Sequence, residues 1–123
     1  MFTPPYRFMD AMRECGSPIE LPFLRTVLLG SAPVTVSFLE KLEKFSFFRH
    51  AQVIALYGAT EILPIASIDA KEKIERKHEF PGDVLGYPFP DIDCAIEHDS
   101  ELVIRSGRQF LRYLGGEAPQ RDS

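Results

Sequence analysis

The residues best suited to chemistry stand together in one short run, Tyr57-Gly58-Ala59-Thr60-Glu61, directly after the apolar segment 52–56. The run supplies an aromatic ring, a flexible glycine, a hydroxyl and a carboxylate. Hydroxyl and carboxylate oxygens are hard donors of the kind that Mg²⁺ binds together with phosphate oxygens and water. The apolar segment predicts a buried strand, and an open α/β sheet builds its ligand sites where such strands end. The run therefore predicts a ligand site at the carboxyl edge of a sheet.

Each polar residue of this run also has an ordinary structural interpretation. Tyr57 could lie at the edge of the core, Thr60 could be a helix N-cap, and Glu61 could be a first-turn carboxylate favoured by the helix dipole. Because the run alone does not separate these alternatives from a ligand site, the elements around it have to decide.

A second turn of suitable composition follows an earlier strand. Segment 24–29 is rich in Leu and Val and runs directly into Gly30-Ser31-Ala32-Pro33, which predicts a buried strand followed by a sharp turn. A helix is expected after Pro33, with Ser37 or Thr35 as its N-cap. Three apolar residues at helical spacing should face the sheet: Phe38, Leu42 and Phe45.

The strand over 24–29, the helix and a second strand over 52–57 make a βαβ unit of ordinary length, roughly thirty residues. Such crossovers make the two strands parallel and are nearly always right-handed. The turn at 30–33 and the turn at 57–61 should therefore leave the same edge of the sheet and line one crevice. This arrangement would bring both turns to one ligand.

Three further segments lie beside the predicted βαβ unit. Residues 6–14 have apolar side chains at helical spacing, which predicts a short amphipathic helix. Segment 62–68 is apolar but is interrupted by Pro64, so it could be a strand or a loop. Segment 69–80 is dense in both signs of charge, which predicts a solvated helical face.

The composition changes at Pro81-Gly82, where a glycine- and proline-containing stretch begins. Segments 93–97 and 101–105 alternate apolar and polar residues, which predicts a half-buried antiparallel hairpin. The polar tail after Gly115 should be frayed. The predicted fold class is α/β: a parallel strand-helix-strand layer over residues 1–80, followed by a small antiparallel β module over residues 81–123.

The composition excludes several classes of protein. The 123 residues suit one domain, and 45% hydrophobic with 26% charged residues is ordinary for a soluble globular chain. Lys and Arg number 14 against 18 Asp and Glu, a net charge of −4, and they form no basic stripe, so no nucleic-acid partner is predicted. No apolar run approaches the ~20 residues of a membrane span and the N-terminus does not resemble a signal peptide, which predicts a cytoplasmic protein.

The cysteines and histidines do not predict a metal or redox site. Cys15 and Cys94 show no spacing suited to zinc and are interpreted as small apolar residues. The three histidines are scattered and are interpreted as loop or surface residues: His50, His78 and His98.

Three motifs in this order resemble a known family. They are the segment 24–33, the run 57–61, and Gly82-Asp83-Val84-Leu85-Gly86-Tyr87-Pro88. Together they resemble the large N-terminal domain of the adenylate-forming, AMP-producing ligases, the superfamily of acyl-CoA synthetases, luciferase and peptide-synthetase adenylation domains. Segment 101–105 is similar to the strand that follows in that family. The resemblance extends over nearly the whole chain.

The resemblance implies an activity and a set of site residues. Enzymes of this family join a carboxylic acid to the α-phosphate of ATP, release pyrophosphate, and pass the acyl group to CoA or another acceptor. By resemblance, the turn at 30–33 borders adenine, Tyr57 stacks on it, Gly58 and Ala59 lie next to the acyl group, and Thr60 donates to the α-phosphate. The implied nucleotide-binding residues are Gly30, Ser31, Ala32, Pro33, Tyr57, Gly58, Ala59 and Thr60. The implied catalytic residues are Thr60 and Glu61, with Glu61 as the Mg²⁺ ligand.

The sequence departs from the family pattern in ways that narrow this expectation. Nothing between Met1 and Pro22 resembles the family's phosphate-binding loop, and the ribose-binding aspartate and the domain with the catalytic lysine would lie beyond Ser123. Ser106-Gly107 stands where the family usually has glycine then proline, which puts the local β geometry in question. The expectation is a fragment of such a ligase that is inactive by itself.

Two points stay open at this stage. The apolar run 62–65 resembles the fatty-acyl branch of the family, and similar runs occur in β-lactone synthetases. The alternative function is a non-catalytic module that binds nucleotide or associates with itself or with a partner through an exposed sheet edge.

Overall fold

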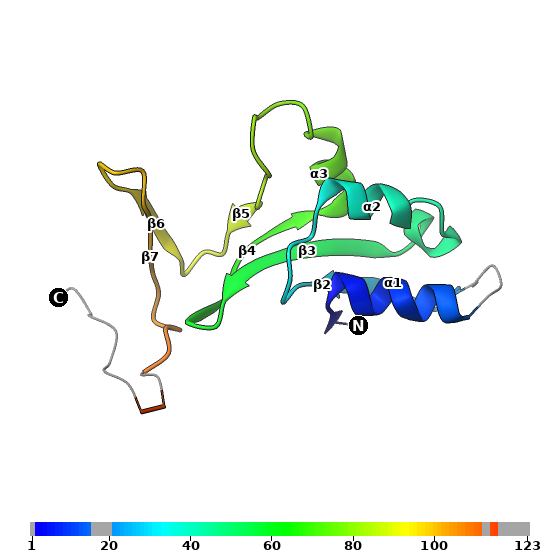
Figure 1. Ribbon diagram of the computed structural model, residues 1–123, viewed down its shortest axis with the longest axis horizontal. Helices are drawn as coiled ribbons and strands as arrows, with labels where there is room; N and C mark the ends of the chain where they lie inside the picture. The colour runs from blue at the N-terminus through cyan, green and yellow to red at the C-terminus, as the bar shows by residue number, and fades with distance from the viewer. Residues whose placement is uncertain (1, 16–20, 112–113, 116–123) are drawn as a thin grey trace.

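The computed structural model describes residues 2–15, 21–111 and 114–115. A five-stranded sheet with helices forms the larger part, and a two-stranded hairpin extends from it (Figure 1). The strands of the larger sheet, in spatial order, are β1 (Phe2–Thr3), β2 (Thr26–Leu29), β3 (Gln52–Ala59), β4 (Ile62–Asp69) and β5 (Tyr87–Pro88). The hairpin consists of β6 (Asp93–Ile96) and β7 (Leu102–Arg105).

The first three strands of the sheet are parallel and the last three are antiparallel. β2 pairs with both β1 and β3 in parallel, and β4 pairs with β3 and β5 in antiparallel orientation. The predicted parallel pair of strands is thus confirmed, with Val27 opposite Val53 and Leu29 opposite Ala55. The predicted α/β fold class, with its separate antiparallel module, is also confirmed.

Three α-helices and one 3₁₀ turn connect these strands: α1 (Pro5–Glu14), α2 (Val36–Leu42), η1 (Ser46–Arg49) and α3 (Ala70–Glu75). α1 confirms the helix predicted over 6–14. The N-cap of α2 is Thr35, whose hydroxyl accepts a hydrogen bond of 3.2 Å from the Phe38 N–H, so the alternative with Ser37 is excluded. α2 and α3 lie next to each other over β3 and β4 (Figure 1).

One face of the sheet carries the main hydrophobic core. Alternate residues of the strands are buried there, as the twofold side-chain period requires: Val27, Leu29, Val53, Ala55 and Ile68. Side chains from the helices complete this core, including Leu39 and Leu42 of α2 and the edge-to-face pair Phe8 and Phe47, whose ring centroids are 5.5 Å apart. The core holds β2 and β3 in register, and this register fixes where their carboxyl ends lie.

The segment whose structure the sequence left open, 62–68, is a strand. It forms β4, which returns antiparallel to β3 and places Ala55 opposite Ile68 and Tyr57 opposite Ala66. Pro64 is accommodated near the start of the strand, before the pairs with β5 at Ala66 and Ser67.

The charged segment after β4 differs from its prediction. It contains α3, which does expose Lys71 and Glu75, but Lys73 is only 3% exposed. The prediction of a solvated face is therefore wrong for Lys73. Ala70, also buried, lies three residues before it, so the two share the face that packs on the sheet.

The predicted antiparallel hairpin is confirmed by β6 and β7, but its predicted half burial is wrong. Cys94 pairs with Ile104 and Ile96 with Leu102, which puts four apolar side chains on one face. Ile96 is 76% exposed and Leu102 is 45% exposed, because among the described residues only Ile104 of this face packs against a core cluster. Cys15 and Cys94, interpreted from the sequence as small apolar residues, are both exposed free thiols.

Two sequence predictions are not tested by the described residues. The boundary near residue 81 stays a prediction; β5, which lies after it, pairs with β4 of the larger sheet. The frayed tail after Gly115 lies outside the described residues. Within the described ranges, no helix combines the length and the apolar character needed to cross a membrane.

Candidate functional site

The two turns singled out from the sequence lie at the same edge of the sheet, where the parallel strands β2 and β3 end. They line a cavity of about 520 Å³, a volume typical of small-molecule sites. Residues 31–34 contribute one wall and residues 55–60 another. Gly30 and Glu61 directly flank these lining residues.

The first wall begins with a backbone turn that few side chains tolerate. Ser31 has a φ of 66°, the left-handed region, and lies exposed after the end of β2. Gly30 is buried, and a Cβ there would lie 3.0 Å from the Phe2 ring and 3.4 Å from Leu56 Cβ. The absence of a side chain at Gly30 thus makes room for neighbours in the same chain.

The second wall contains a break in the regular strand pairing. The register between β3 and β4 shifts between Tyr57 and Ala59, an irregularity that is common next to functional sites. Gly58 stands in this break, and a Cβ there would lie 2.5 Å from Leu63 Cδ1 and 3.2 Å from the Ile62 carbonyl oxygen. The glycine therefore lets β4 approach the cavity-lining part of β3.

Tyr57 is half-buried and lines the cavity. It also packs against a second hydrophobic cluster that includes Ile62, Ile65 and Ile92. The ring thus has the core-edge contacts of its structural interpretation and borders the cavity at the same time.

Thr60 and Glu61 form the turn between β3 and β4. The strand β4 begins directly after them, so the interpretation of Thr60 as a helix N-cap and of Glu61 as a first-turn carboxylate is wrong. Thr60 is exposed and borders the cavity, and the Glu61 main-chain carbonyl accepts a hydrogen bond of 2.9 Å from the Phe110 N–H. The segment after β7 therefore docks on the turn that carries these two residues.

The sequence did not indicate two charged residues that line the same cavity. Lys73 Nζ of α3 donates to Asp83 Oδ2 at 2.9 Å, and both side chains border the cavity. The side chain of Lys73 is 3% exposed and that of Asp83 45%. A local signal for Lys73 existed: it lies on the helical face of the buried Ala70 and next to Ile74, which packs against the core.

Asp83 belongs to an irregular segment whose end is fixed by a glycine. Leu85 of this segment also lines the cavity. Gly86 has a φ of 111°, and a Cβ there would lie 2.3 Å from the Ser67 carbonyl oxygen. Only glycine fits this approach to β4, so Gly86 determines where Asp83 and Leu85 stand.

Two polar networks tie the segments around the site to the sheet. The Tyr87 hydroxyl donates to Glu72 and accepts a 3.0 Å hydrogen bond from Arg76, and the bond to the carboxylate raises the pKa of Tyr87. In the second network, Arg108 Nη2 donates to Asp91 Oδ1 at 2.9 Å, and this hydrogen bonding lowers the pKa of Asp91. Arg108 also donates from Nη1 to the Leu63 carbonyl oxygen at 3.2 Å.

Ser106-Gly107, where the sequence departs from the family pattern, lies at the start of this second network. The Ser106 hydroxyl donates to Asp91 at 3.3 Å and accepts from the Arg108 N–H at 3.1 Å. A Cβ at Gly107 would meet nothing within 4 Å. The hydroxyl of Ser106 thus closes the turn after β7 through these two hydrogen bonds.

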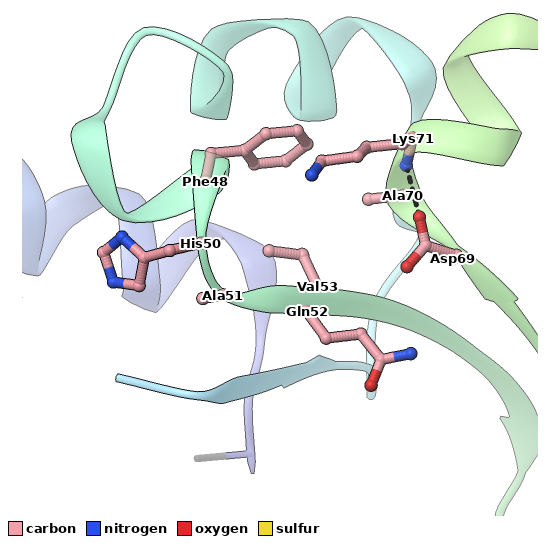
Figure 2. Close-up of a pocket in the computed structure, with 8 residues that line it drawn as sticks. All are labelled: Phe48, His50, Ala51, Gln52, Val53, Asp69, Ala70 and Lys71. Atoms are coloured by element: carbon pink, nitrogen blue, oxygen red, sulfur yellow. Dashed lines mark hydrogen bonds between the residues drawn. The ribbon is translucent and has the colours of Figure 1, made fainter. Parts of the chain in front are cut away.

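A second hollow lies at the other end of β3 and contains none of the predicted site residues. Its volume is about 200 Å³, and it is bordered by the start of β3 and the start of α3 (Figure 2). The Lys71 side chain extends toward the Phe48 ring, with Nζ 5.9 Å from the ring centroid. The main-chain N–H of Lys71 donates to Asp69 Oδ1 at 2.9 Å. His50 points away from both, and its Nε2 lies 3.0 Å from the Leu21 carbonyl oxygen (Figure 2). Lys71, Asp69 and His50 thus already interact with other residues of the chain. We therefore assign the site to the cavity of about 520 Å³ at the carboxyl ends of β2 and β3.

The described residues contain no cluster of three His, Cys, Asp or Glu side chains that could hold a metal ion. The predicted ligand Glu61 is thus a single carboxylate next to the Thr60 hydroxyl. One carboxylate suits Mg²⁺ when substrate phosphates and water supply its other ligands. The donor set therefore fits a nucleotide-bound Mg²⁺ and does not form a protein-only cage.

The family model of AMP-binding enzymes matches residues 1–110. The chain belongs to the AMP-binding enzyme family. The recognition of an adenylate-forming ligase from the three motifs is thereby confirmed. The AMP-binding family assignment covers all the turns, strands and helices described above.

Two solved structures have the same fold. One is o-succinylbenzoate coenzyme A synthetase (MenE) from Bacillus subtilis in complex with AMP, with 18% identity and a TM-score of 0.62. The other is the same enzyme in complex with the acyl-adenylate intermediate OSB-AMP, with 18% identity and a TM-score of 0.64. Each match covers 88% of this chain and 22% of that chain, so this member of the AMP-binding family spans about a fifth of the length of those enzymes.

Proposed function

We propose that this chain forms the part of an AMP-forming acid ligase that binds adenine and the α-phosphate. The observation that carries the proposal is the cavity of about 520 Å³ between the turn at 31–34 and residues 55–60. Both walls come from the carboxyl ends of parallel strands, where α/β sheets bind nucleotides. The chain belongs to the family of AMP-binding enzymes, so we propose adenine nucleotides as the ligands.

The proposed roles of the individual residues follow from their positions. Tyr57 borders the cavity and its ring is of a type suited to stack on a flat base, with residues 31–34 in the other wall. The Thr60 hydroxyl lies in the turn beyond the strand and would donate to the α-phosphate. Glu61 would hold Mg²⁺, which when bound offsets the charge that develops on the phosphate oxygens.

The complete ligase would activate a carboxylic acid with ATP and transfer the acyl group to CoA or another acceptor. We propose a fatty acid as the substrate, because the segment after Glu61 is apolar. A β-lactone synthetase uses the same first step and is the alternative within this class. Acid-dependent exchange of labelled pyrophosphate into ATP by the full-length ligase, tested with fatty and β-hydroxy acids, would distinguish these substrates.

Calorimetric titration of this chain with nucleotides tests the binding proposal. We expect AMP to bind in the absence of Mg²⁺, and ATP to bind as its Mg²⁺ complex. Thr60→Ala should weaken both by about ten- to a hundredfold, the value of one hydrogen bond to a charged group. Glu61→Ala should weaken Mg·ATP and leave AMP in chelator unchanged, while Glu43→Ala, an exposed carboxylate at the other end of α2, should change neither. Absence of AMP binding by the folded wild-type chain would refute the proposal.

The isolated chain should bind nucleotide without activating an acid. The resemblance places the phosphate loop and the catalytic lysine outside these 123 residues, so the contacts made only in the transition state are missing. We expect no release of pyrophosphate from ATP with any fatty acid. Release that is lost in Glu61→Ala would show that this expectation is wrong.

The second candidate function is protein association, and one observation favours it. The apolar face of the β6–β7 hairpin is exposed, with Ile96 at 76% and Leu102 at 45%. The two edge strands of the larger sheet, β1 and β5, are each only two residues long and favour association less. Light scattering of the wild type and of Ile96→Ser would separate the two functions: a monomer in both cases counts against association.

A further inference from the structure

Among the described residues, Lys73 and Asp83 are the two charged ones that line the proposed nucleotide cavity. The other polar side chains on its lining are Ser31, Tyr57 and Thr60. The proposed function uses the ring of Tyr57 for stacking and the hydroxyl of Thr60 for phosphate. A nucleotide bound in this way still presents the polar edge of its base to the cavity.

The position of the pair suits the base end of such a ligand. Thr60 lies in the turn beyond β3, whereas Lys73 belongs to α3, which begins directly after Asp69, the partner of Ile54 in the sheet. From Ala55 to Thr60 the lining of the cavity follows β3 for about 15 Å. If the phosphate lies at Thr60, the base extends back along β3 toward α3.

The pair also has hydrogen-bonding capacity to spare. An ammonium group carries three N–H donors, and within the described part of the chain the acceptor of Lys73 Nζ is Asp83 Oδ2 at 2.9 Å. Asp83 keeps its second carboxylate oxygen, and its side chain is 45% exposed. Lys73 is 3% exposed and lines the cavity, so a ligand that reaches its remaining donors does so from the cavity.

We propose that Lys73 and Asp83 recognise the edge of the adenine base, with the Asp83 carboxylate accepting from the 6-amino group and the Lys73 ammonium donating to a ring nitrogen. This inference rests on the proposed function and names the residues that determine its base specificity. Adenine places an amino donor beside a nitrogen acceptor, which complements one carboxylate and one ammonium. A base with oxygen at position 6 would face Asp83 with a second acceptor, which disfavours binding.

A comparison of AMP with IMP in titrations of the 123-residue chain tests the proposal, because IMP carries oxygen in place of the 6-amino group. We expect the wild type to bind AMP at least about tenfold more tightly than IMP. Asp83→Asn keeps the shape and supplies an amide that can donate to the oxygen, so the preference should shrink to about threefold or less. Glu79→Gln, an exposed carboxylate in an ion pair with Arg76, should leave the preference unchanged.

The outcomes separate this inference from the function on which it rests. If AMP does not bind, the proposed function fails and this inference with it. If AMP and IMP bind equally to the wild type, or if Asp83→Asn retains the full preference for AMP, only the base recognition is refuted. A further measurement needs no variant: purine riboside monophosphate, which lacks the 6-amino group, should also bind the wild type about tenfold more weakly than AMP. Equal binding of that nucleotide and AMP would refute the role of Asp83.

Discussion

Gly86 determines the position of one cavity wall, and its replacement by alanine should destabilise the protein strongly. Its φ of 111° is unfavourable for any side chain, at a cost of about 1–3 kcal/mol. In addition, the new Cβ would lie 2.3 Å from the Ser67 carbonyl oxygen and 2.9 Å from the Ile68 nitrogen. Both atoms are main chain of β4, which is paired on both sides, so they cannot move aside as a side chain would.

We therefore expect Gly86→Ala to lower the free energy of unfolding by about 3 kcal/mol or more, the backbone strain plus an overpacking cost of about 1–3 kcal/mol. For a urea dependence of about 1.5 kcal/mol per M, this lowers the midpoint of urea denaturation by about 2 M. A loss of this size is a large fraction of the stability of a small domain. Tyrosine fluorescence or circular dichroism during urea titration measures the midpoint.

Gly82 provides the matched control at the other end of the same segment. A Cβ there would meet nothing within 4 Å, and no positive φ applies to it. Gly82→Ala should therefore leave stability unchanged or raise it by up to about 1 kcal/mol through the unfolded state. If Gly86→Ala unfolds within about 0.3 M of the wild type, the proposed fixation of the 83–86 segment by Gly86 is wrong. A Gly86→Ala chain that fails to fold, beside a folded Gly82→Ala chain, is the extreme form of the expected result.

The two polar networks give the remaining predictions. Hydrogen bonding from Arg108 lowers the pKa of Asp91, so its stabilising effect is present above the ordinary carboxyl pKa of about 4 and is lost as the pH falls through the lowered pKa. Urea midpoints of the wild type and Asp91→Asn should accordingly differ at neutral pH and converge in acid; a constant difference would contradict the pairing. The bond to Glu72 raises the pKa of Tyr87, so the phenol should ionise above the ordinary value of about 10, and this contribution to stability is lost as the pH rises through the raised pKa. Spectrophotometric titration should show that one tyrosine ionises at lower pH in Glu72→Gln than in the wild type, and an unchanged titration would count against this bond.

The local patterns of the sequence determined the βαβ unit and the edge of the sheet at which the proposed site lies. A run of apolar residues, a turn with glycine and a helix with apolar residues at helical spacing all depend on neighbours within a few positions. Because a crossover connection makes the flanking strands parallel, the sequence was sufficient to place the turn at 30–33 and residues 57–61 at the same edge of the sheet. The hairpin of β6 and β7 followed from alternation in the same way.

The tertiary structure alone decided the features that depend on contacts between distant residues. The strand character of 62–68 comes from pairing with β3 and β5, which override the interruption at Pro64. The turn at Thr60 and Glu61 leads into that strand, and this excluded the helix-cap interpretation that the sequence could not exclude.

The burial of Lys73 is the clearest case of a feature that depends on contacts between distant residues. A run of mixed charges predicts solvation, but α3 packs on the sheet over its short length and turns one lysine toward a carboxylate ten residues later. Burial of a charge is tolerated because a partner is present, and the partner is brought there by Gly86 and the pairing of β5. The sequence thus determined the family, the parallel pair of β2 and β3 and the two turns, whereas only the packing of α3 against the sheet placed a charged pair in the cavity.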